Sequence, residues 1–242
     1  MSAERAVPPA AETLAAGAVL RADGLSVGYA GAPVCAPVDV VVGAGQMLAV
    51  IGANGSGKST LLRAVLGLLE PLAGTVEVLG REVDERERAF RSHVAGVLDA
   101  DAYFPGLTTR EHLVLTARGH AVRSAGTVVD ELLDQFGLTG QAGAVPESLS
   151  SGQRRRLLLA AGFARPRRLL VLDEPEQRLD VRMRRTLAQL MREDAARGVS
   201  IVFATHDEDL LEGTGAPALL VTDDVCEVLS PAAAVAALAR GL

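Results

Sequence analysis

The stretch Gly52-Ala53-Asn54-Gly55-Ser56-Gly57-Lys58-Ser59-Thr60 decides the fold of this chain. It fits the pattern G-x-x-x-x-G-K-[ST], in which a glycine-rich turn presents backbone N–H groups and the following helix adds the positive end of its dipole. Lys58 is the one lysine among the 24 lysine and arginine residues. A compact ammonium and a planar guanidinium are not interchangeable, so lysine is retained where it has a specific task. The segment therefore predicts a phosphate-binding loop.

The residues on either side of this loop agree with that prediction. Met47–Ile51 reads as a buried strand, and Ser59–Leu68 reads as a helix with its leucines and Val65 facing inward. In such a strand-loop-helix unit, Lys58 reaches the β- and γ-phosphates of a nucleotide, and the Ser59 hydroxyl ligates Mg²⁺. A glycine-rich turn that matches by chance is the alternative. The predicted nucleotide-binding residues of the loop are Gly52, Asn54, Gly55, Ser56, Gly57, Lys58, Ser59 and Thr60.

A second group of candidate residues follows an apolar run in Leu169-Leu170-Val171-Leu172-Asp173-Glu174-Pro175. A strand that delivers two acids at its carboxyl end places them in the crevice where open α/β sheets bind ligands. Asp173 is the expected Mg²⁺ ligand, and Glu174 is the expected general base for an attacking water. The alternative is a strand that simply ends at a charged surface. The presence of a phosphate loop in the same chain makes this alternative less favoured.

A third segment, Leu149-Ser150-Ser151-Gly152-Gln153, precedes an arginine-rich helix. Ser150 or Ser151 can cap that helix, and their hydroxyls together with exposed N–H groups can form an anion site. A helix cap without any ligand is the other interpretation. The residues by themselves leave both open.

The remaining pattern divides the chain into strands and helices. Strands are expected at 20–29, 38–42, 75–79, 94–98, 200–204, 218–221 and 225–229, and helices at 108–118, 128–136, 150–164, 180–197 and 230–242. Three helices follow one another without a strand, which predicts an inserted helical subdomain at about residues 99–165. The predicted fold class is α/β, with a P-loop NTPase core and mainly parallel sheet, an N-terminal antiparallel β subdomain and the inserted α-helical subdomain.

Composition limits the classes of function. The chain has 242 residues, 49% of them hydrophobic, and a net charge of −6. This acidic balance argues against nucleic acid as a partner, since phosphate backbones are bound through clustered positive charge. Two arginine clusters, Arg154-Arg155-Arg156 and Arg182 with Arg184-Arg185, lie on predicted helices and are interpreted as solvated or partner-facing surfaces.

The termini and apolar runs bear on the location of the protein. Residues 1–17 read as a flexible tail, without the basic start and apolar core of a secretory signal. The apolar runs are far shorter than the roughly 18 to 20 residues that cross a bilayer. Cys35 and Cys226 are too few for a disulfide framework and are expected to be packing residues. The expected location is the cytosol.

Five motifs occur in one order: the phosphate loop, LSSGQ at 149–153, VLDEP at 171–175, Leu179-Asp180 and Ala204-Thr205-His206. With the helical insertion, they resemble the ATP-binding subunit of an ABC transporter over roughly residues 18–230. The resemblance implies an ABC-type ATPase domain at 18–242 that binds ATP and Mg²⁺ and hydrolyses ATP. It implies a cytoplasmic subunit, peripheral on the inner face of the cell membrane, that powers a separate membrane-spanning permease and pairs with a second ATPase subunit as a homodimer or heterodimer.

The resemblance also implies roles for individual residues. In that family two ATPase domains dimerise head to tail, so Ser150 and Gly152 are expected at the γ-phosphate bound by the other subunit, and Asp180 is expected to cross the interface. His206 matches the family's switch histidine and joins Lys58 and Glu174 as a predicted catalytic residue. Tyr29 matches the aromatic residue that stacks on adenine, and a plain strand tyrosine is the alternative.

Some positions depart from the family's pattern. Ser151 stands where glycine is usual, and Glu176-Gln177-Arg178 replaces small residues. Aligning Phe104–Thr108 puts Asp99 where a glutamine approaches Mg²⁺, so Asp99 is a candidate metal ligand, with a solvated loop residue as the alternative. The stretch 103–113 is similar to export systems and favours an exporter. Two other functions stay open: a soluble, non-transport ABC ATPase, and an ATP-binding module with impaired turnover.

Overall fold

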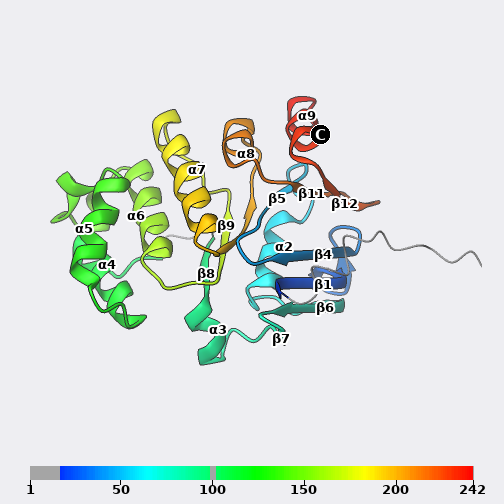
Figure 1. The fold of residues 1–242 in the computed structure, drawn as a ribbon, viewed down its shortest axis with the longest axis horizontal. Helices are drawn as coiled ribbons and strands as arrows, with labels where there is room; N and C mark the ends of the chain where they lie inside the picture. Colours follow the sequence, from blue (N-terminus) through cyan, green and yellow to red (C-terminus); the bar gives the residue numbers. More distant parts are fainter. Residues whose placement is uncertain (1–16, 99–101, 242) are drawn as a thin grey trace, which may run out of the picture.

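The computed structural model describes residues 17–98 and 102–241. Two β-sheets form the centre of the fold, and helices lie between and around them (Figure 1). Apart from Gly17, the predicted N-terminal tail lies outside the described residues, and its flexibility stays a prediction.

The larger sheet has the strand order β12-β11-β5-β10-β9-β8. Neighbouring strands are parallel, except that β12 runs antiparallel to β11. Every residue of β9 and β10 is buried, because helices cover both faces of a parallel sheet. This confirms the mainly parallel core. The strands are β5 (Met47–Ile51), β8 (Val94–Val97), β9 (Leu169–Asp173), β10 (Ser200–Ala204), β11 (Ala218–Val221) and β12 (Cys226–Leu229).

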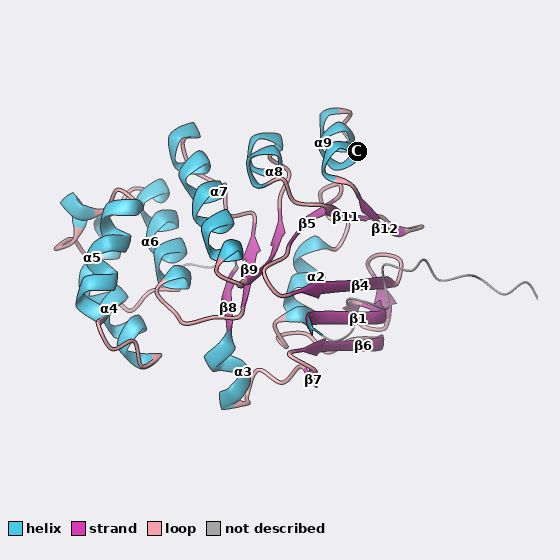
Figure 2. Ribbon diagram, in the orientation of Figure 1, coloured by secondary structure: helices cyan, strands magenta, loops and turns pink. Residues whose placement is uncertain are grey.

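A second, antiparallel sheet is formed mainly by the N-terminal part of the chain (Figure 2). Its order is β4-β1-β6-β7, with β1 (Ala18–Ser26), β4 (Val38–Gly43), β6 (Ala73–Val78) and β7 (Arg81–Glu82). A short hairpin, β2 (Gly28–Tyr29) with β3 (Ala32–Pro33), lies between β1 and β4 in the chain. Helix α2 (Lys58–Val65) packs between the two sheets, because Leu61 and Leu62 share one hydrophobic cluster with Val19 of β1 and Val202 of β10.

Helices fill the chain between β8 and β9, as the sequence predicts. They are α4 (Thr109–Gly119), α5 (Ala125–Gln135) and α6 (Ser151–Phe163), with 3-10 turns at Thr139–Gln141 and Pro146–Ser148. Among the described residues from 102 to 168 there is no strand. Figure 1 shows these helices grouped beyond β8, at the end of the molecule away from the antiparallel sheet. The boundaries of this subdomain, about 99–165, stay a prediction.

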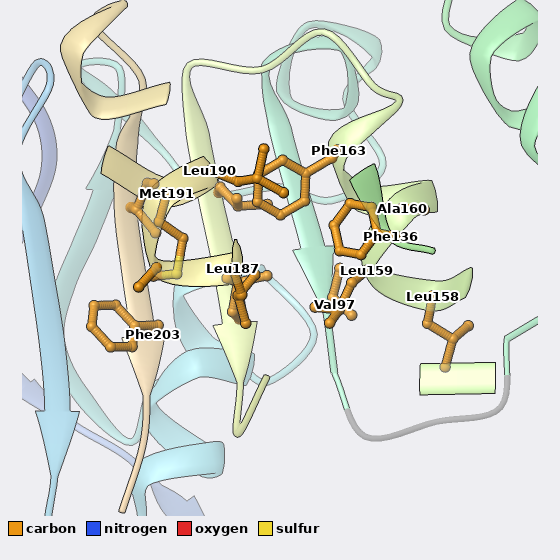
Figure 3. Packing of buried hydrophobic residues seen from close by; sticks show 14 of the residues in the cluster. Val97, Phe136, Leu158, Leu159, Ala160, Phe163, Leu187, Leu190, Met191 and Phe203 are labelled. Atoms are coloured by element: carbon orange, nitrogen blue, oxygen red, sulfur yellow. The ribbon is translucent and has the colours of Figure 1, made fainter. Parts of the chain in front are cut away.

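The helical group and the larger sheet share one hydrophobic core. The rings of Phe136 and Phe163 lie 5.6 Å apart between centroids, and both belong to the cluster that contains Val97 of β8 (Figure 3). Leu187 and Met191, on α7 (Val181–Ala196), extend the same cluster over the sheet. Helix α8 (Glu208–Thr214) lies beside α7 on this face, and α9 (Pro231–Ala239) lies beside α8 (Figure 1). Within the described ranges no helix has the length and apolar character that a bilayer span requires.

Several element ends differ from the predicted ranges. Helix α2 ends at Val65 rather than Leu68, because Gly67 adopts φ 71° and reverses the backbone. The predicted strand 20–29 is divided between β1 and β2. Helices α3 (Arg88–His93) and α8 were not predicted, since helices of six and seven residues carry little periodicity.

Candidate active site

The register of three parallel strands brings the predicted catalytic segments together. Val50 of β5 pairs with Ala204 of β10, and Ala204 pairs with Asp173 of β9. The chain leaves these strands at one edge of the sheet, as the phosphate loop after β5, as residues 174–178 after β9 and as Thr205-His206 after β10. Segments that are distant in the sequence therefore meet at the carboxyl edge, where parallel sheets bind ligands.

Two glycines of the phosphate loop are required by the space around them. A Cβ atom at Gly52 would lie 2.5 Å from the carbonyl oxygen of Val221. Gly57 has φ 98°, and a Cβ there would lie 2.8 Å from Cγ2 of Val34. Only glycine adopts this path without strain, so the loop makes the tight turn that the motif predicts.

One buried hydroxyl of the loop fits a phosphate ligand. Ser56 is 9% exposed, and its Oγ has no hydrogen-bond partner within residues 17–98 and 102–241. Buried polar atoms are rarely left unpaired, and a phosphate oxygen would supply the missing partner. Asn54 and Gly55 are exposed at the tip of the loop, and Thr60 is half-buried on α2.

Lys58 is the first residue of α2 and is 5% exposed. Its Nζ donates to the carbonyl oxygens of Gly52 and Ala53, at 2.9 Å each. Burial lowers the pKa of Lys58, while the acids at the end of β9 and in the following turn act in the opposite direction. The ammonium therefore lies within electrostatic reach of those acids, and it is held inside the loop that would surround a phosphate.

Ser59 and Asp173 supply oxygen donors that fit Mg²⁺. Asp173 ends β9 and is 6% exposed, and Ser59 is an exposed residue in the first turn of α2. Mg²⁺ is usually held by one or two protein oxygens together with substrate phosphates. The described residues contain no cluster of three or more acidic, histidine or cysteine side chains that would form a separate metal site. Asp99 lies outside the described residues, so its place at the metal stays a prediction.

Glu174 and His206 lie next to each other. Nδ1 of His206 is 3.6 Å from Oε1 of Glu174. Glu174 has φ 44°, a conformation that is uncommon outside glycine and recurs at functional sites. Its N–H donates to the carbonyl of Ala204 at 3.0 Å, and the Gln177 amide donates to its Oε2. Its side chain is 21% exposed, so the carboxylate is held in place yet open to water, as a general base must be.

The interpretation of the first arginine cluster as a solvated surface is wrong for Arg155. Arg155 is 4% exposed, and its Nη2 donates to the carbonyl oxygens of Asp173 at 2.6 Å and Glu174 at 2.8 Å. Hydrogen bonds from a charged donor are among the stronger ones in proteins. Arg155 therefore ties α6 to the backbone that carries the two acids, a role that the sequence analysis missed.

A second missed residue is Glu176, which follows the acid pair. Glu176 is 3% exposed, and its Oε1 accepts a hydrogen bond from the Thr205 hydroxyl at 2.6 Å. The same oxygen accepts from the backbone N–H of His206 at 3.3 Å. The signal in the sequence was the departure from small residues at 176–178, but nothing in the sequence placed Glu176 beside His206.

The residues expected to reach another subunit lie at helix ends. Ser150 caps α6: its Oγ accepts from the Gln153 N–H at 3.2 Å, and Gln153 Oε1 accepts from the Ser150 N–H at 2.9 Å. Asp180 caps α7 through a 2.8 Å bond from the Met183 N–H. In the part of the chain that the structure describes, no hydrogen bond or ion pair joins Ser150, Gly152 or Asp180 to the phosphate loop of the same chain.

Tyr29 belongs to a segment that packs on the phosphate loop. It is 53% exposed at the end of β2 and pairs with Ala32 in the hairpin. The chain then runs into Val34, the residue that a side chain at Gly57 would meet. An exposed ring on a segment that reaches the loop through Val34 is compatible with stacking on adenine, which stays a prediction.

The family model described as ABC transporter matches residues 35–177. The chain is 38% identical over 202 residues to the cytochrome c biogenesis ATP-binding export protein CcmA of Cupriavidus pinatubonensis, which covers 84% of this chain and 88% of that protein. It is 40% identical over 174 residues to the sulfate/thiosulfate import ATP-binding protein CysA of Mycolicibacterium paratuberculosis, covering 71% of this chain and 48% of that protein. It is 38% identical over 167 residues to the Nod factor export ATP-binding protein I of Burkholderia lata, covering 68% of this chain and 55% of that protein. The chain thus spans about half the length of the latter two relatives.

Solved structures agree with this assignment. A structure of an ATP binding subunit of an ABC transporter has a TM-score of 0.79 and 28% identity, covering 87% of this chain and 90% of that one. CbiO1 from Clostridium perfringens, part of the ABC transporter complex CbiONQ, has the same fold, with a TM-score of 0.73 at 22% identity and coverage of 91% of each chain. The chain therefore belongs to the ABC transporter family, as an ATP-binding subunit with ATPase activity.

Proposed function

We propose that this chain powers an exporter by hydrolysing ATP between its phosphate loop and Glu174, while it is held by a membrane-spanning permease at the inner face of the cell membrane. The observation that carries the proposal is the meeting of Lys58, Glu174 and His206 at one edge of the sheet, set by the pairing of Val50, Ala204 and Asp173. A nucleotide phosphate held in the loop would lie among a cation, a partly solvated base and an imidazole.

The residues divide the hydrolysis between them. Water attacks the γ-phosphorus, the bond to the β,γ-bridging oxygen breaks, and Glu174 accepts the proton from the water. Lys58 and His206 stabilise the negative charge of the γ-phosphate oxygens. Mg²⁺, held by Ser59 and Asp173, would neutralise further charge on the phosphates. The support for Glu174 as the base is its distance of 3.6 Å from His206 and its partial exposure.

The composite site of two subunits is part of this proposal. Ser150, Ser151 and Asp180 are exposed at helix N-termini, where N–H groups and the helix dipole favour an anion. Their side chains make bonds that stabilise their own helices, as for Ser150 and Asp180, or face solvent. This supports an encounter of the serine segment with phosphate bound by a second ATPase subunit, and of Asp180 with the rim of that subunit's phosphate loop, rather than with the loop of the same chain.

Export is the proposed direction of transport. The cytochrome c biogenesis relative, which this chain matches over 88% of its length, is named an export protein. The sulfate/thiosulfate relative is named an import protein and is matched over 48% of its length. The better length agreement with the export protein supports export.

Co-expression with a membrane protein whose gene neighbours the gene of this chain tests the proposal. We expect the two to purify together in detergent as a stable complex and to hydrolyse ATP, with substrate leaving the ATP side in proteoliposomes. Absence of a complex would contradict the transport role and favour a non-transport ATPase. A complex that binds ATP without turnover would contradict hydrolysis, and substrate movement toward the ATP side would contradict export.

A further inference from the structure

Glu176 is a buried acid in the turn between β9 and α7, three residues after the Mg²⁺ ligand expected at Asp173. It is 3% exposed, although the turn is at the edge of the sheet where the chain reaches the surface. Acidic side chains are almost never fully buried unless they are paired. The contacts of Glu176 therefore decide what it does.

One oxygen atom of Glu176 holds the start of the His206 segment. Oε1 accepts from the Thr205 hydroxyl at 2.6 Å and from the His206 N–H at 3.3 Å. The Thr205 hydroxyl oxygen in turn accepts from the Asp207 N–H at 3.0 Å. Three successive residues, 205 to 207, are thereby fixed by a chain of bonds that begins at the Glu176 carboxyl.

The same oxygen faces the imidazole. Nδ1 of His206 is 3.9 Å from Glu176 Oε1 and 3.6 Å from Glu174 Oε1. Because Nδ1 lies near two carboxyl groups, the orientation of the ring is set. Nε2 is then the ring nitrogen that can contact a ligand. His206 is 53% exposed and has little packing of its own to set its position. Its placement therefore depends on the groups that hold its backbone and Nδ1.

Hydrogen bonds compensate only in part for the burial of the Glu176 carboxyl group. Burial raises the pKa of Glu176, while the bonds from Thr205 and His206 act in the opposite direction. Its other oxygen, Oε2, is buried and has no hydrogen-bond partner in the described ranges. An incompletely bonded acid is costly to bury, and such groups concentrate at functional sites.

We propose that Glu176 is a positioning residue for hydrolysis: it holds Thr205 and His206 so that the imidazole meets the γ-phosphate beside Glu174. This inference rests on the proposed function, in which His206 acts on the γ-phosphate. Glu176 acts through His206 and does not itself contact the nucleotide.

Two variants with side chains of similar volume distinguish the loss of the hydrogen-bond acceptor at position 176 from a change in side-chain volume. Glu176→Gln keeps an oxygen that can accept from Thr205 and His206, and Glu176→Met keeps the length of the side chain but offers only a weak thioether acceptor in place of the oxygen. We expect the Met variant to lower kcat for ATP about tenfold with KM changed less than about twofold, and the Gln variant to stay within about threefold of wild type.

The matched control is Asp194→Asn. Asp194 is 5% exposed and pairs with Arg167 at the far end of α7, so the substitution disturbs a buried acid away from the site. It should lower the melting temperature and leave kcat unchanged. A loss of kcat in this variant equal to that of Glu176→Met would overturn the inference, because stability alone would then explain the effect.

A double-mutant cycle with His206→Ala gives the decisive result. If Glu176 acts through His206, Glu176→Met should lower kcat less than about twofold further in the His206→Ala protein. A full tenfold further loss would overturn the positioning role while leaving the role of His206 intact. Wild-type kcat in the His206→Ala protein itself would instead remove the premise taken from the proposed function.

Amide hydrogen exchange supplies a readout that does not require turnover. The His206 N–H is bonded to Glu176, so it should exchange about tenfold faster in Glu176→Met than in Glu176→Gln. Equal exchange rates in the two variants would overturn the inference, even if His206→Ala has too little activity for the cycle.

Discussion

Nη2 of Arg155 donates to the carbonyl oxygen of Asp173 at 2.6 Å, which joins the first turns of α6 to the end of β9. The bond links the helix capped by Ser150 to the strand that carries the expected Mg²⁺ ligand. A second bond, to the carbonyl of Glu174 at 2.8 Å, fixes the next peptide as well. The segment predicted to meet a second subunit is thus connected through Arg155 to the two acids that we expect to act in hydrolysis.

Replacing Arg155 by methionine should destabilise the protein. It leaves two carbonyl oxygens at the end of β9 without this donor, which costs about 2–3 kcal/mol in the free energy of unfolding. Urea denaturation of the two proteins measures the difference. Arg182→Met, at an exposed position of α7, is the control and should change the free energy by less than about 0.5 kcal/mol. Equal stability of the Arg155 variant and wild type would contradict the buried role.

Lys58→Arg should weaken ATP binding although it preserves charge. The compact Lys58 ammonium donates to Gly52 and Ala53 inside a tight loop, and a planar guanidinium does not fit that space. We expect the dissociation constant for ATP to rise by about tenfold or more, which is about 1.4 kcal/mol. Calorimetric titration with ATP measures it. An unchanged dissociation constant would show that the loop does not hold phosphate through this ammonium.

Ser151→Asp tests the contact with a second subunit. Gly152 is a poor probe, because a Cβ there would lie 2.8 Å from the carbonyl oxygen of Arg178 in the same chain. Ser151 is exposed in the first turn of α6, where the helix dipole stabilises a negative charge. The substitution should therefore preserve the fold.

In a Glu174→Gln background, ATP should produce a dimer, and adding Ser151→Asp should raise its dissociation constant by about tenfold or more, because the new charge faces phosphate. Light scattering with and without ATP gives the mass. If the Ser151→Asp protein dimerises as tightly as its parent, this segment does not meet phosphate. Absence of any ATP-dependent dimer would contradict pairing of two copies and leave a heterodimer.

The pH dependence of stability should report the burial of Glu176. Burial raises its pKa in the folded state, so the folded protein binds this proton more tightly than the unfolded chain. The stability that protonation provides is present at low pH and is lost as pH rises through the raised pKa. Glutamine at this position does not ionise and loses nothing.

The free energy of unfolding of Glu176→Gln minus that of wild type should therefore increase as pH rises above the usual glutamate pKa of about 4.3, and level off above the raised pKa. Urea denaturation at several pH values measures this difference. The Asp194→Asn protein serves as a comparison, since Asp194 is paired with Arg167. A difference for Glu176→Gln that is constant or falls with pH would mean that Glu176 is not buried in a way that disfavours its charge.

The sequence predicted the elements whose burial follows a simple pattern. Strand β9 is an apolar run because both of its faces are covered, and α7 shows Leu187 and Met191 at helical spacing. The phosphate loop and the two acids were predicted because their residue types are specific to that chemistry. Short elements such as α8 were missed, although Asp207 caps it and Gly215 ends it with φ 65°.

The sequence did not predict Arg155 and Glu176, for physical reasons. Consecutive helix residues point about 100° apart, so three arginines in a row cannot all face solvent. Which of the three is buried depends on where the sheet packs against α6. Glu176 meets Thr205 only because β9 and β10 are neighbours in register. Contacts of this kind depend on strand order, which no local pattern encodes.

Turnover of ATP by the Glu174→Gln protein tests the central claim most directly. The account predicts that kcat falls by about 10² to 10⁴, the usual scale for a general base, while the dissociation constant for ATP stays near that of wild type. Glu212→Gln, an exposed acid of α8, is the control and should hydrolyse ATP like wild type. Wild-type turnover by the Glu174→Gln protein would contradict the assignment of the catalytic base.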